Sequence, residues 1–249
     1  MDIPIRDDFI AKWKKYFNKA ELPIAFEYTD AADPALIPKP TKAPHRCVIA
    51  DIMGVSKGKT LALDNDAIGC AGGRRYLGFS QDLRPGFEYF LSCGIEGKME
   101  GERYKKSPEL VTEMLKNART FTAPRKYIVF KRWDTLAEAD SPEAVIFFAP
   151  PDVLSGLFTL AGFEESDVNG VICPFSAGCG SIVGYPMLEA ASDHPRAVLG
   201  MFDVSARPYV PQGVLTMAVP MKKFVRMIAD MDESFLITES WAKINKRIG

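Results

Sequence analysis

The chain has 249 residues and a formal net charge of −1, with 47% apolar and 25% charged residues, as in an ordinary globular protein. Nucleic-acid binding is not expected, because phosphate neutralisation needs a basic surplus. No segment is apolar over the roughly 18 residues of a membrane helix, and the charged N-terminus lacks the core of a signal peptide. We therefore expect a cytoplasmic protein with no membrane contact.

The first 22 residues predict a helix docked on a single domain over residues 1–249, because apolar residues recur at helical spacing opposite lysines. A short strand is expected next, at residues 23–28. The proline-rich segment 29–45 predicts an extended surface connection, and residues 46–51 are typical of either a buried strand or the start of a helix.

A sequence close to a phosphate-binding loop lies at residues 54–60, Gly-Val-Ser-Lys-Gly-Lys-Thr. A P-loop has four residues between its first glycine and Gly-Lys-Thr, and it opens a helix. Here three residues intervene, and the following residues 61–64 have the character of a strand. The segment is therefore expected to be a lysine-rich turn and not a nucleotide site.

A charged segment at residues 96–106 separates two predicted helices, one over residues 85–91 and one that starts at Ser107-Pro108. Its alternating charges favour a solvated loop. The functional alternative is that Tyr104 and Lys105 fold over a bound anion.

Strands and helices alternate in the second half of the chain. The predicted strands are residues 127–130, 144–149, 168–173, 197–202 and 214–219. This β-α-β order predicts an α/β (or α+β) fold, a single domain with a mixed sheet flanked by helices. We expect the sheet to be built mainly from residues 127–219, with the N-terminal third packed against it.

Two loops rich in cysteine and glycine, Gly69–Phe79 and Cys173–Ser181, are the candidate functional elements, and we expect the fold to bring them into one cleft. One hypothesis is a thiolate site for an iron–sulfur cluster, zinc or another soft metal. Its candidate metal ligands are Cys47, Cys70, Cys173 and Cys179. Only Cys173 and Cys179 are closely spaced, without the paired Cys-x-x-Cys of strong metal signatures.

Two alternatives need no metal. The first is an anion- or metabolite-binding module, since glycine N–H groups at a helix start and an arginine can hold an anion. Its candidate ligand-binding residues are Gly72, Gly73, Arg74, Gly178, Gly180 and Ser181. The second is an enzyme with Cys70 as its nucleophile. The fifth cysteine, Cys93, lies in an apolar setting and is expected in the core.

Three motifs follow one another as Arg46-Cys47, the run Lys57–Leu63, and Cys70-Ala71-Gly72-Gly73. This order resembles domain of unknown function family 169, a group of uncharacterised bacterial and archaeal proteins (ArCR-like), and a Gly-Cys-Gly-Ser loop like that at 178–181 belongs to the likeness. The resemblance covers about residues 24–231 and implies one α/β cytosolic domain with Cys70 and Cys179 at its site. It implies no established reaction. The expected partner is a small molecule or a metal, and the oligomeric state, a homodimer included, is left open.

Overall fold

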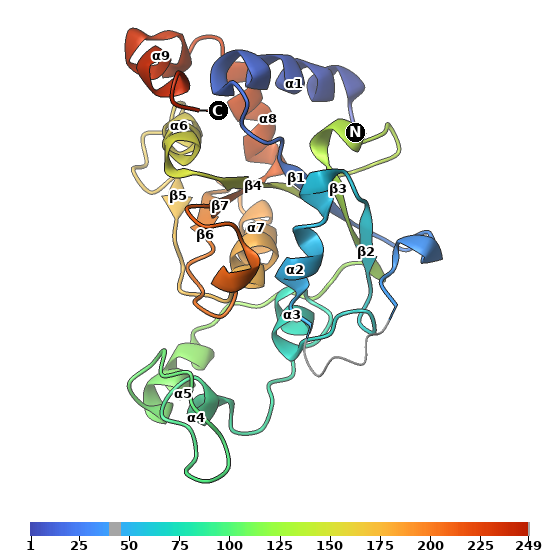
Figure 1. Cartoon of the computed structure of the whole chain (residues 1–249), viewed down its shortest axis with the longest axis vertical. Helices are drawn as coiled ribbons and strands as arrows, with labels where there is room; N and C mark the ends of the chain where they lie inside the picture. Colours follow the sequence, from blue (N-terminus) through green and yellow to red (C-terminus); the bar gives the residue numbers. More distant parts are fainter. Residues whose placement is uncertain (40–45, 249) are drawn as a thin grey trace.

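One mixed sheet organises the chain in the computed structural model, which describes residues 1–39 and 46–248. Within these residues the strand order is β2-β3-β1-β4-β7-β6-β5 (Figure 1). The strands are β1 (Ile24–Thr29), β2 (Leu61–Leu63), β3 (Tyr127–Arg132), β4 (Ala144–Ala149), β5 (Val171–Ile172), β6 (Ala197–Gly200) and β7 (Leu215–Pro220). The predicted α/β fold with a mixed sheet is confirmed.

The N-terminal strand β1 lies inside the sheet, between β3 and β4, and pairs antiparallel with both. The expectation that the N-terminal third packs against a sheet of later residues was therefore wrong for β1 and β2. The physical reason is that Ile24, Ala25 and Phe26 are all buried, which requires cover on both faces of the strand. Only β5 and β6 run parallel among the described strands.

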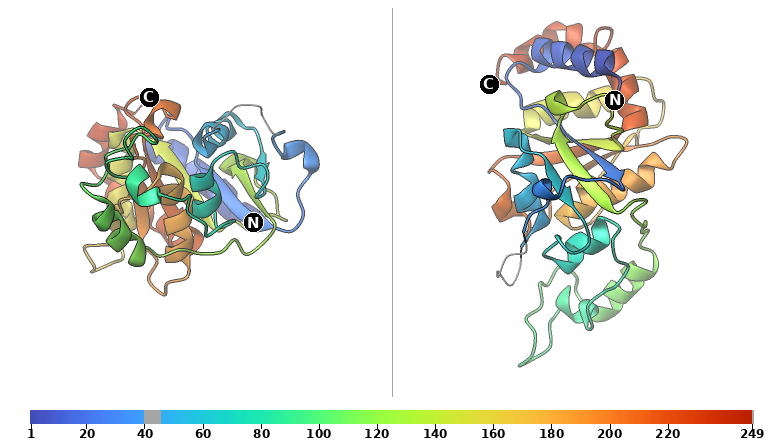
Figure 2. Two further views of the ribbon diagram at one scale, coloured as in Figure 1. Left: turned by 90° about the horizontal axis from the view of Figure 1, so that it is seen from below. Right: turned by 90° about the vertical axis from the view of Figure 1, so that its right-hand side faces the viewer.

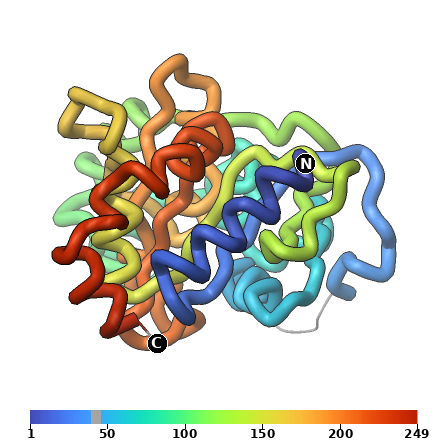
Figure 3. The backbone as a smooth tube through the Cα atoms, turned by 90° about the horizontal axis from the view of Figure 1, so that it is seen from above, coloured from blue at the N-terminus to red at the C-terminus, as the bar shows by residue number. Residues whose placement is uncertain are grey.

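One face of the sheet is covered by four helices, among them those from both ends of the described residues. These are α1 (Ile3–Phe17), α6 (Pro151–Ala161), α8 (Met221–Asp230) and α9 (Glu239–Asn245), and Figure 3 shows α1 beside the C-terminal helices. Rings from α1, α8 and the 3-10 turn after β3 (Trp133–Thr135) form the centre of this layer: Phe224 lies 5.0 Å from Phe9 and 5.1 Å from Trp133, measured between ring centroids. The docked N-terminal helix predicted for the first 22 residues is thus present as α1.

The opposite face is covered by shorter helices. They are α2 (Val48–Ile52), α3 (Ala71–Tyr76), the π-helical segment η4 (Gly180–Gly184) and α7 (Tyr185–Ala190), which continues η4. Ile49, Ile182 and Val183 join Phe26 and Phe130 of the sheet in a second core. Both cysteine–glycine segments therefore belong to one layer of the molecule (Figure 1).

Residues 81–120, called the arm below, leave the sheet layers and return to them (Figure 2). The arm contains α4 (Phe87–Phe90) and α5 (Pro108–Lys116). Ser107 accepts a hydrogen bond from the Leu110 amide at the start of α5, as its sequence predicts. The charged segment folds back on α4, where the Lys105 amide donates to the Leu91 carbonyl at 3.0 Å.

The ambiguous segments of the first half have definite structures. Residues 46–51 lead into helix α2 and do not form a strand. The P-loop-like sequence is a turn, as expected: Val55–Lys57 form a 3-10 helix that ends at Gly58, whose φ of +86° suits glycine, and β2 follows. In the proline-rich connection Pro34–Leu36 form another 3-10 turn, while residues 40–45 lie outside the described residues. Over the parts of the chain that the structure describes, none of the helices has the length and apolar character to cross a bilayer.

Candidate functional site

Cys70 begins a helix and does not sit in an open loop. It is the N-cap of α3, and its half-buried Sγ accepts a hydrogen bond from the Gly73 amide at 3.2 Å. Gly73 is buried, and a Cβ there would lie only 2.9 Å from the Cys70 Sγ and from the Ile68 Cγ2. Close packing thus explains why a glycine stands at position 73, and the Gly73 amide is hydrogen-bonded to the Cys70 thiol.

Cys47 lies beside Cys70. A Cβ built on Gly69 would be 3.4 Å from the Cα of Arg46, and one on Gly73 would be 3.5 Å from the Cγ1 of Val48. The residues before and after Cys47 therefore contact residues on either side of Cys70. Partial burial raises the pKa of the Cys47 thiol, and the neighbouring thiol of Cys70 raises it further.

Cys179 comes from the second loop and is buried between α2 and α3. A Cβ on the preceding Gly178 would lie 3.6 Å from the Cγ1 of Ile49 in α2, and one on Gly180 would lie 2.7 Å from the Cδ1 of Tyr76 in α3. Burial raises the pKa of Cys179 well above its usual value, with further contributions from Cys70 and Cys47. The structure thus brings together Cys47, Cys70 and Cys179, called the thiol cluster below.

Asp203 is a residue of this region that sequence reasoning missed. Its Oδ2 accepts from the Gly178 amide at 2.9 Å, and its Oδ1 accepts from the amide and hydroxyl of Ser205 at 3.0 and 2.7 Å. Its charge also contributes to the raised pKa values of Cys47 and Cys179. The Asp-Val-Ser turn after a strand was the available signal, since such side chains commonly hold turns.

Two residues of the arm reach the same loops. The Nζ of Lys105 lies 4.0 Å from the centroid of the Phe175 ring, in the loop that precedes Cys179. The hydroxyl of Tyr104 lies beside Ser205 and Asp203, and partial burial raises its pKa. The arm therefore folds back onto the loops that position Cys179 and Asp203, although the charge pattern alone favoured a solvated loop.

Two cysteines lie apart from the thiol cluster. Cys173 is exposed, and partial burial alone raises its pKa, with no contribution from another thiol. Cys93 is also exposed, so its expected place in the core was wrong. The neighbouring Ser92 is buried instead, and its hydroxyl is satisfied by donating to the Glu88 carbonyl at 2.6 Å. Among residues 1–39 and 46–248, no three His, Cys, Asp or Glu side chains are arranged to hold a metal ion.

The other predicted ligand-binding residues have varied surroundings. Gly72 is exposed, with nothing within 4 Å of a Cβ built on it, and the Nε of Arg74 donates to the Ile68 carbonyl at 3.1 Å. Ser181 is buried; its hydroxyl donates to the Gly178 carbonyl at 2.8 Å and accepts from the Met201 amide at 3.2 Å. Contact of these residues with a ligand stays a prediction.

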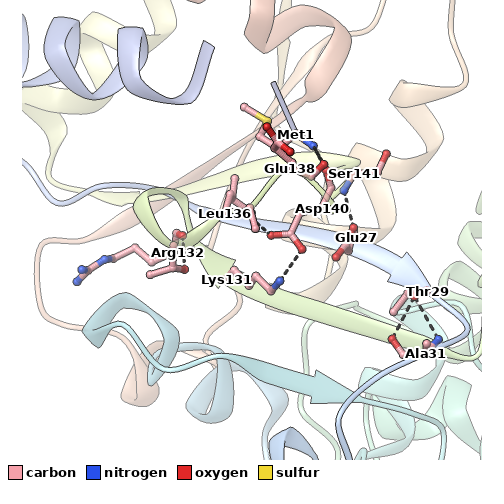
Figure 4. Close-up of polar contacts among 12 residues, drawn as sticks. Met1, Glu27, Thr29, Ala31, Lys131, Arg132, Leu136, Glu138, Asp140 and Ser141 are labelled. Atoms are coloured by element: carbon pink, nitrogen blue, oxygen red, sulfur yellow. Dashed lines mark hydrogen bonds and ion pairs between the residues drawn. The ribbon is translucent and has the colours of Figure 1, made fainter. Parts of the chain in front are cut away.

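A separate polar cluster joins β1, β3 and the segment before β4 (Figure 4). Lys131 pairs with Asp140, whose other oxygen accepts from the Ala137 amide at 2.8 Å, and Glu27 accepts from the Ser141 amide at 2.6 Å. Burial raises the pKa of Glu27, and the charge of Asp140 adds to this rise. Since the carboxylates satisfy local backbone donors, this cluster fixes the β3–β4 connection and lies away from the cysteines.

The comparison with family models finds the family that the order of the three sequence motifs predicted. The model of domain of unknown function family 169, described as uncharacterised ArCR, matches residues 13–230. Searches among curated proteins and solved structures found no match. The matched residues include the thiol cluster, Asp203 and the arm.

Proposed function

The chain belongs to domain of unknown function family 169, and we propose that it binds a small anionic molecule beside the thiol cluster, against Lys105. The main support for this proposal is that the arm folds back onto the rest of the chain. Its residues Lys105 and Tyr104 lie against the loops that contain Cys179 and Asp203. We place this activity in the cytoplasm, where thiols stay reduced.

The charges around the loops favour an anion over a cation. Both oxygens of the Asp203 carboxylate already accept hydrogen bonds from Gly178 and Ser205, so this carboxylate holds the loop conformation. The ammonium of Lys105 contacts an aromatic ring, with no ion pair to a carboxylate among the described residues. A half-buried cation of this kind can pair with a carboxylate or phosphate at a modest desolvation cost.

A binding assay with matched lysine variants tests the proposal. Thermal shift followed by calorimetric titration would use inorganic phosphate, citrate and a nucleoside monophosphate as probes. We expect at least one probe to stabilise the wild type and Lys98→Ala, and to bind roughly 10- to 150-fold more weakly to Lys105→Ala, since one charge-assisted contact contributes about 1.5–3 kcal/mol. Lys98 is the control because it is exposed in the same arm. Equal binding by both variants would contradict the proposal.

A soft metal or an iron–sulfur cluster is the second candidate, favoured by the meeting of three thiols from three segments. The described side chains are not in place for a metal, so binding would require them to shift. The raised pKa values of Cys47 and Cys179 mean that a metal must displace protons, so its affinity should increase with pH.

Anaerobic reconstitution with iron and sulfide, or with zinc, followed by metal analysis tests this candidate. Metal content should fall in Cys47→Ser, Cys70→Ser and Cys179→Ser and persist in Cys173→Ser. A colourless, metal-free wild type after reconstitution would reject it.

A further inference from the structure

We propose that the arm is a hinged lid over the loops around Gly178 and Asp203. Its latch is formed by Tyr104 and Lys105, which hold the arm against these loops. The lid controls access to the site of the function proposed above, so what it admits rests on that function. The movement itself belongs to the chain and can be tested without any ligand.

The two segments that connect the arm to the sheet layers lie side by side. The Ala123 amide donates to the Gly78 carbonyl at 2.8 Å, and the Gln81 side chain donates to the Phe121 carbonyl, also at 2.8 Å. Gly78 has a φ of +79°, and a Cβ on it would lie only 2.6 Å from the Ala123 nitrogen. A narrow, paired base of this kind lets the residues beyond it move as one body.

The body of the arm is held together by its own contacts. Helices α4 and α5 pack against each other more extensively than against any described helix or strand outside the arm. The Glu102 amide donates to the Phe90 carbonyl at 2.7 Å, which ties the charged segment to the end of α4. A second such bond runs from the Arg103 amide to the Ser92 carbonyl at 3.0 Å. Because these contacts are internal, they stay in place when the arm moves away from the sheet layers.

The latch lies at the end of the charged segment. The ammonium of Lys105 is 4.0 Å from the centroid of the Phe175 ring, and the hydroxyl of Tyr104 lies beside Ser205. The Phe175 side chain is 57% exposed, so the contact with Lys105 is made at the surface. A cation–π contact stabilises only weakly at such a site. A weak latch on an internally bonded body suits a lid that opens and closes repeatedly.

Backbone strain marks both sides of this contact. Among the described residues, the non-glycine residues with positive φ are Asn18, Arg103 and Met201, at +49°, +55° and +66°. Asn18 is the C-cap of α1, so the end of a helix accounts for it. Arg103 directly precedes the latch, and the buried Met201 leads into the turn of Asp203. Strain of this kind persists where the surrounding structure holds it, and it gathers at ligand clamps and switch regions.

Hydrogen–deuterium exchange of the ligand-free full chain, followed by mass spectrometry, tests the lid. The latch variants are Tyr104→Phe and Lys105→Met, which remove one polar group each and keep most of the side chain. Lys98→Met is the matched control, because Lys98 is exposed in the same arm. Peptides from residues 174–179 and 201–207 report on the loops, and a peptide from residues 87–95 reports on the interior of the arm.

We expect both latch variants to exchange about two- to fivefold faster than the wild type in the two loop peptides. This change corresponds to the ~0.5–1 kcal/mol of one exposed contact. Exchange in residues 87–95 should stay at the wild-type rate, because a lid moves without unfolding. Lys98→Met should match the wild type in all peptides, and peptides from β4 check that each variant retains the fold.

Two results would overturn the inference. If both latch variants exchange at the wild-type rate in the loop peptides, Tyr104 and Lys105 hold no lid. If residues 87–95 exchange faster together with the loops, the arm unfolds and does not move as one body. Because the assay contains no anion, either result would leave the binding proposal standing. Conversely, failure of every anion probe to bind the wild type would not change the exchange rates expected here.

Discussion

Asp230 is a buried carboxyl at the end of α8, where Glu164 and Glu233 lie near it. Burial and these two charges raise its pKa to about 6. Because the folded chain holds this proton more tightly than the unfolded chain, the charged form costs stability above about pH 6, and this cost disappears as the pH falls toward about 4. Asp230→Asn should therefore stabilise the protein by roughly 1–3 kcal/mol above neutral pH, measured by urea unfolding.

Substitution of Asp232, two residues later, should change the stability of the protein in the opposite direction. The Tyr16 hydroxyl and Lys15 donate to it at 2.6 and 2.9 Å and lower its pKa to about 2. Its stabilising contribution is complete above about pH 4 and is lost as the pH falls through about 2. Asp232→Asn should thus destabilise the protein at neutral pH, in the same urea series. If both variants stabilise the protein, the assignment for Asp232 is contradicted, and if both destabilise it, the assignment for Asp230 is contradicted.

Two helical glycines allow the effect of core packing on stability to be distinguished from the effect of helix propensity. A Cβ on Gly156 in α6 would lie 2.4 Å from the Cη2 of Trp241 and 2.9 Å from the Cε1 of Phe17, whereas one on Gly72 in α3 would meet nothing within 4 Å. Alanine improves helix propensity at both sites by up to about 1 kcal/mol, and overpacking a core costs about 1–3 kcal/mol. Gly72→Ala should leave stability equal or higher, and Gly156→Ala should lower it. Thermal unfolding of the two variants makes the comparison.

Element prediction from the sequence succeeded where local signals agreed. Ser107 starts α5 as its N-cap, and the apolar run Ala144–Ala149 forms β4 with the bounds expected. Helix α3 was not foreseen because two of its six residues are glycines, which disfavour helices. Its formation depends on contacts with α2 and η4, which are set by tertiary structure.

Apolar residues at helical spacing do not all lie in the core. Phe158 of α6 and Val225 of α8 are 51% and 38% exposed. In α8 the side chain of Lys223 is buried instead, where it donates to Glu165 at 2.6 Å. Apolar periodicity cannot identify such a buried charge, because the pairing carboxylate lies in another segment.

At the scale of the molecule, the arm should open before the sheet. Val111 is its one fully buried apolar side chain, so local unfolding of residues 81–120 exposes little core. Limited trypsin digestion should cut first at Lys98, Arg103 or Lys106, all exposed, and leave Lys131 in β3 intact. Mass spectrometry of the early fragments checks this. Early cleavage within β3 would show that the arm and the sheet open together.

The meeting of the two cysteine–glycine segments was expected from the sequence, and Gly180 of the second segment does pack against Tyr76 of the first. Cys47 was also a candidate from the sequence, whereas the exclusion of Cys173 and the role of Asp203 follow from how α2, α3 and the β6–β7 connection pack on one face of the sheet. The family and the α/β class could be predicted as well. The strand order could not, because pairing partners far apart in the chain leave no local pattern.

The position of β1 has a consequence for how the protein is made. Ile24 pairs with Arg132 on one side and with Ile146 on the other, so β1 finds neither neighbour until more than 100 further residues have left the ribosome. At about 5–20 residues per second this wait lasts roughly 5–20 s. During that time Ile24, Ala25 and Phe26, which are buried in the finished sheet, remain without their partners. The nascent chain therefore exposes an apolar segment near its N-terminus that a chaperone could bind during translation.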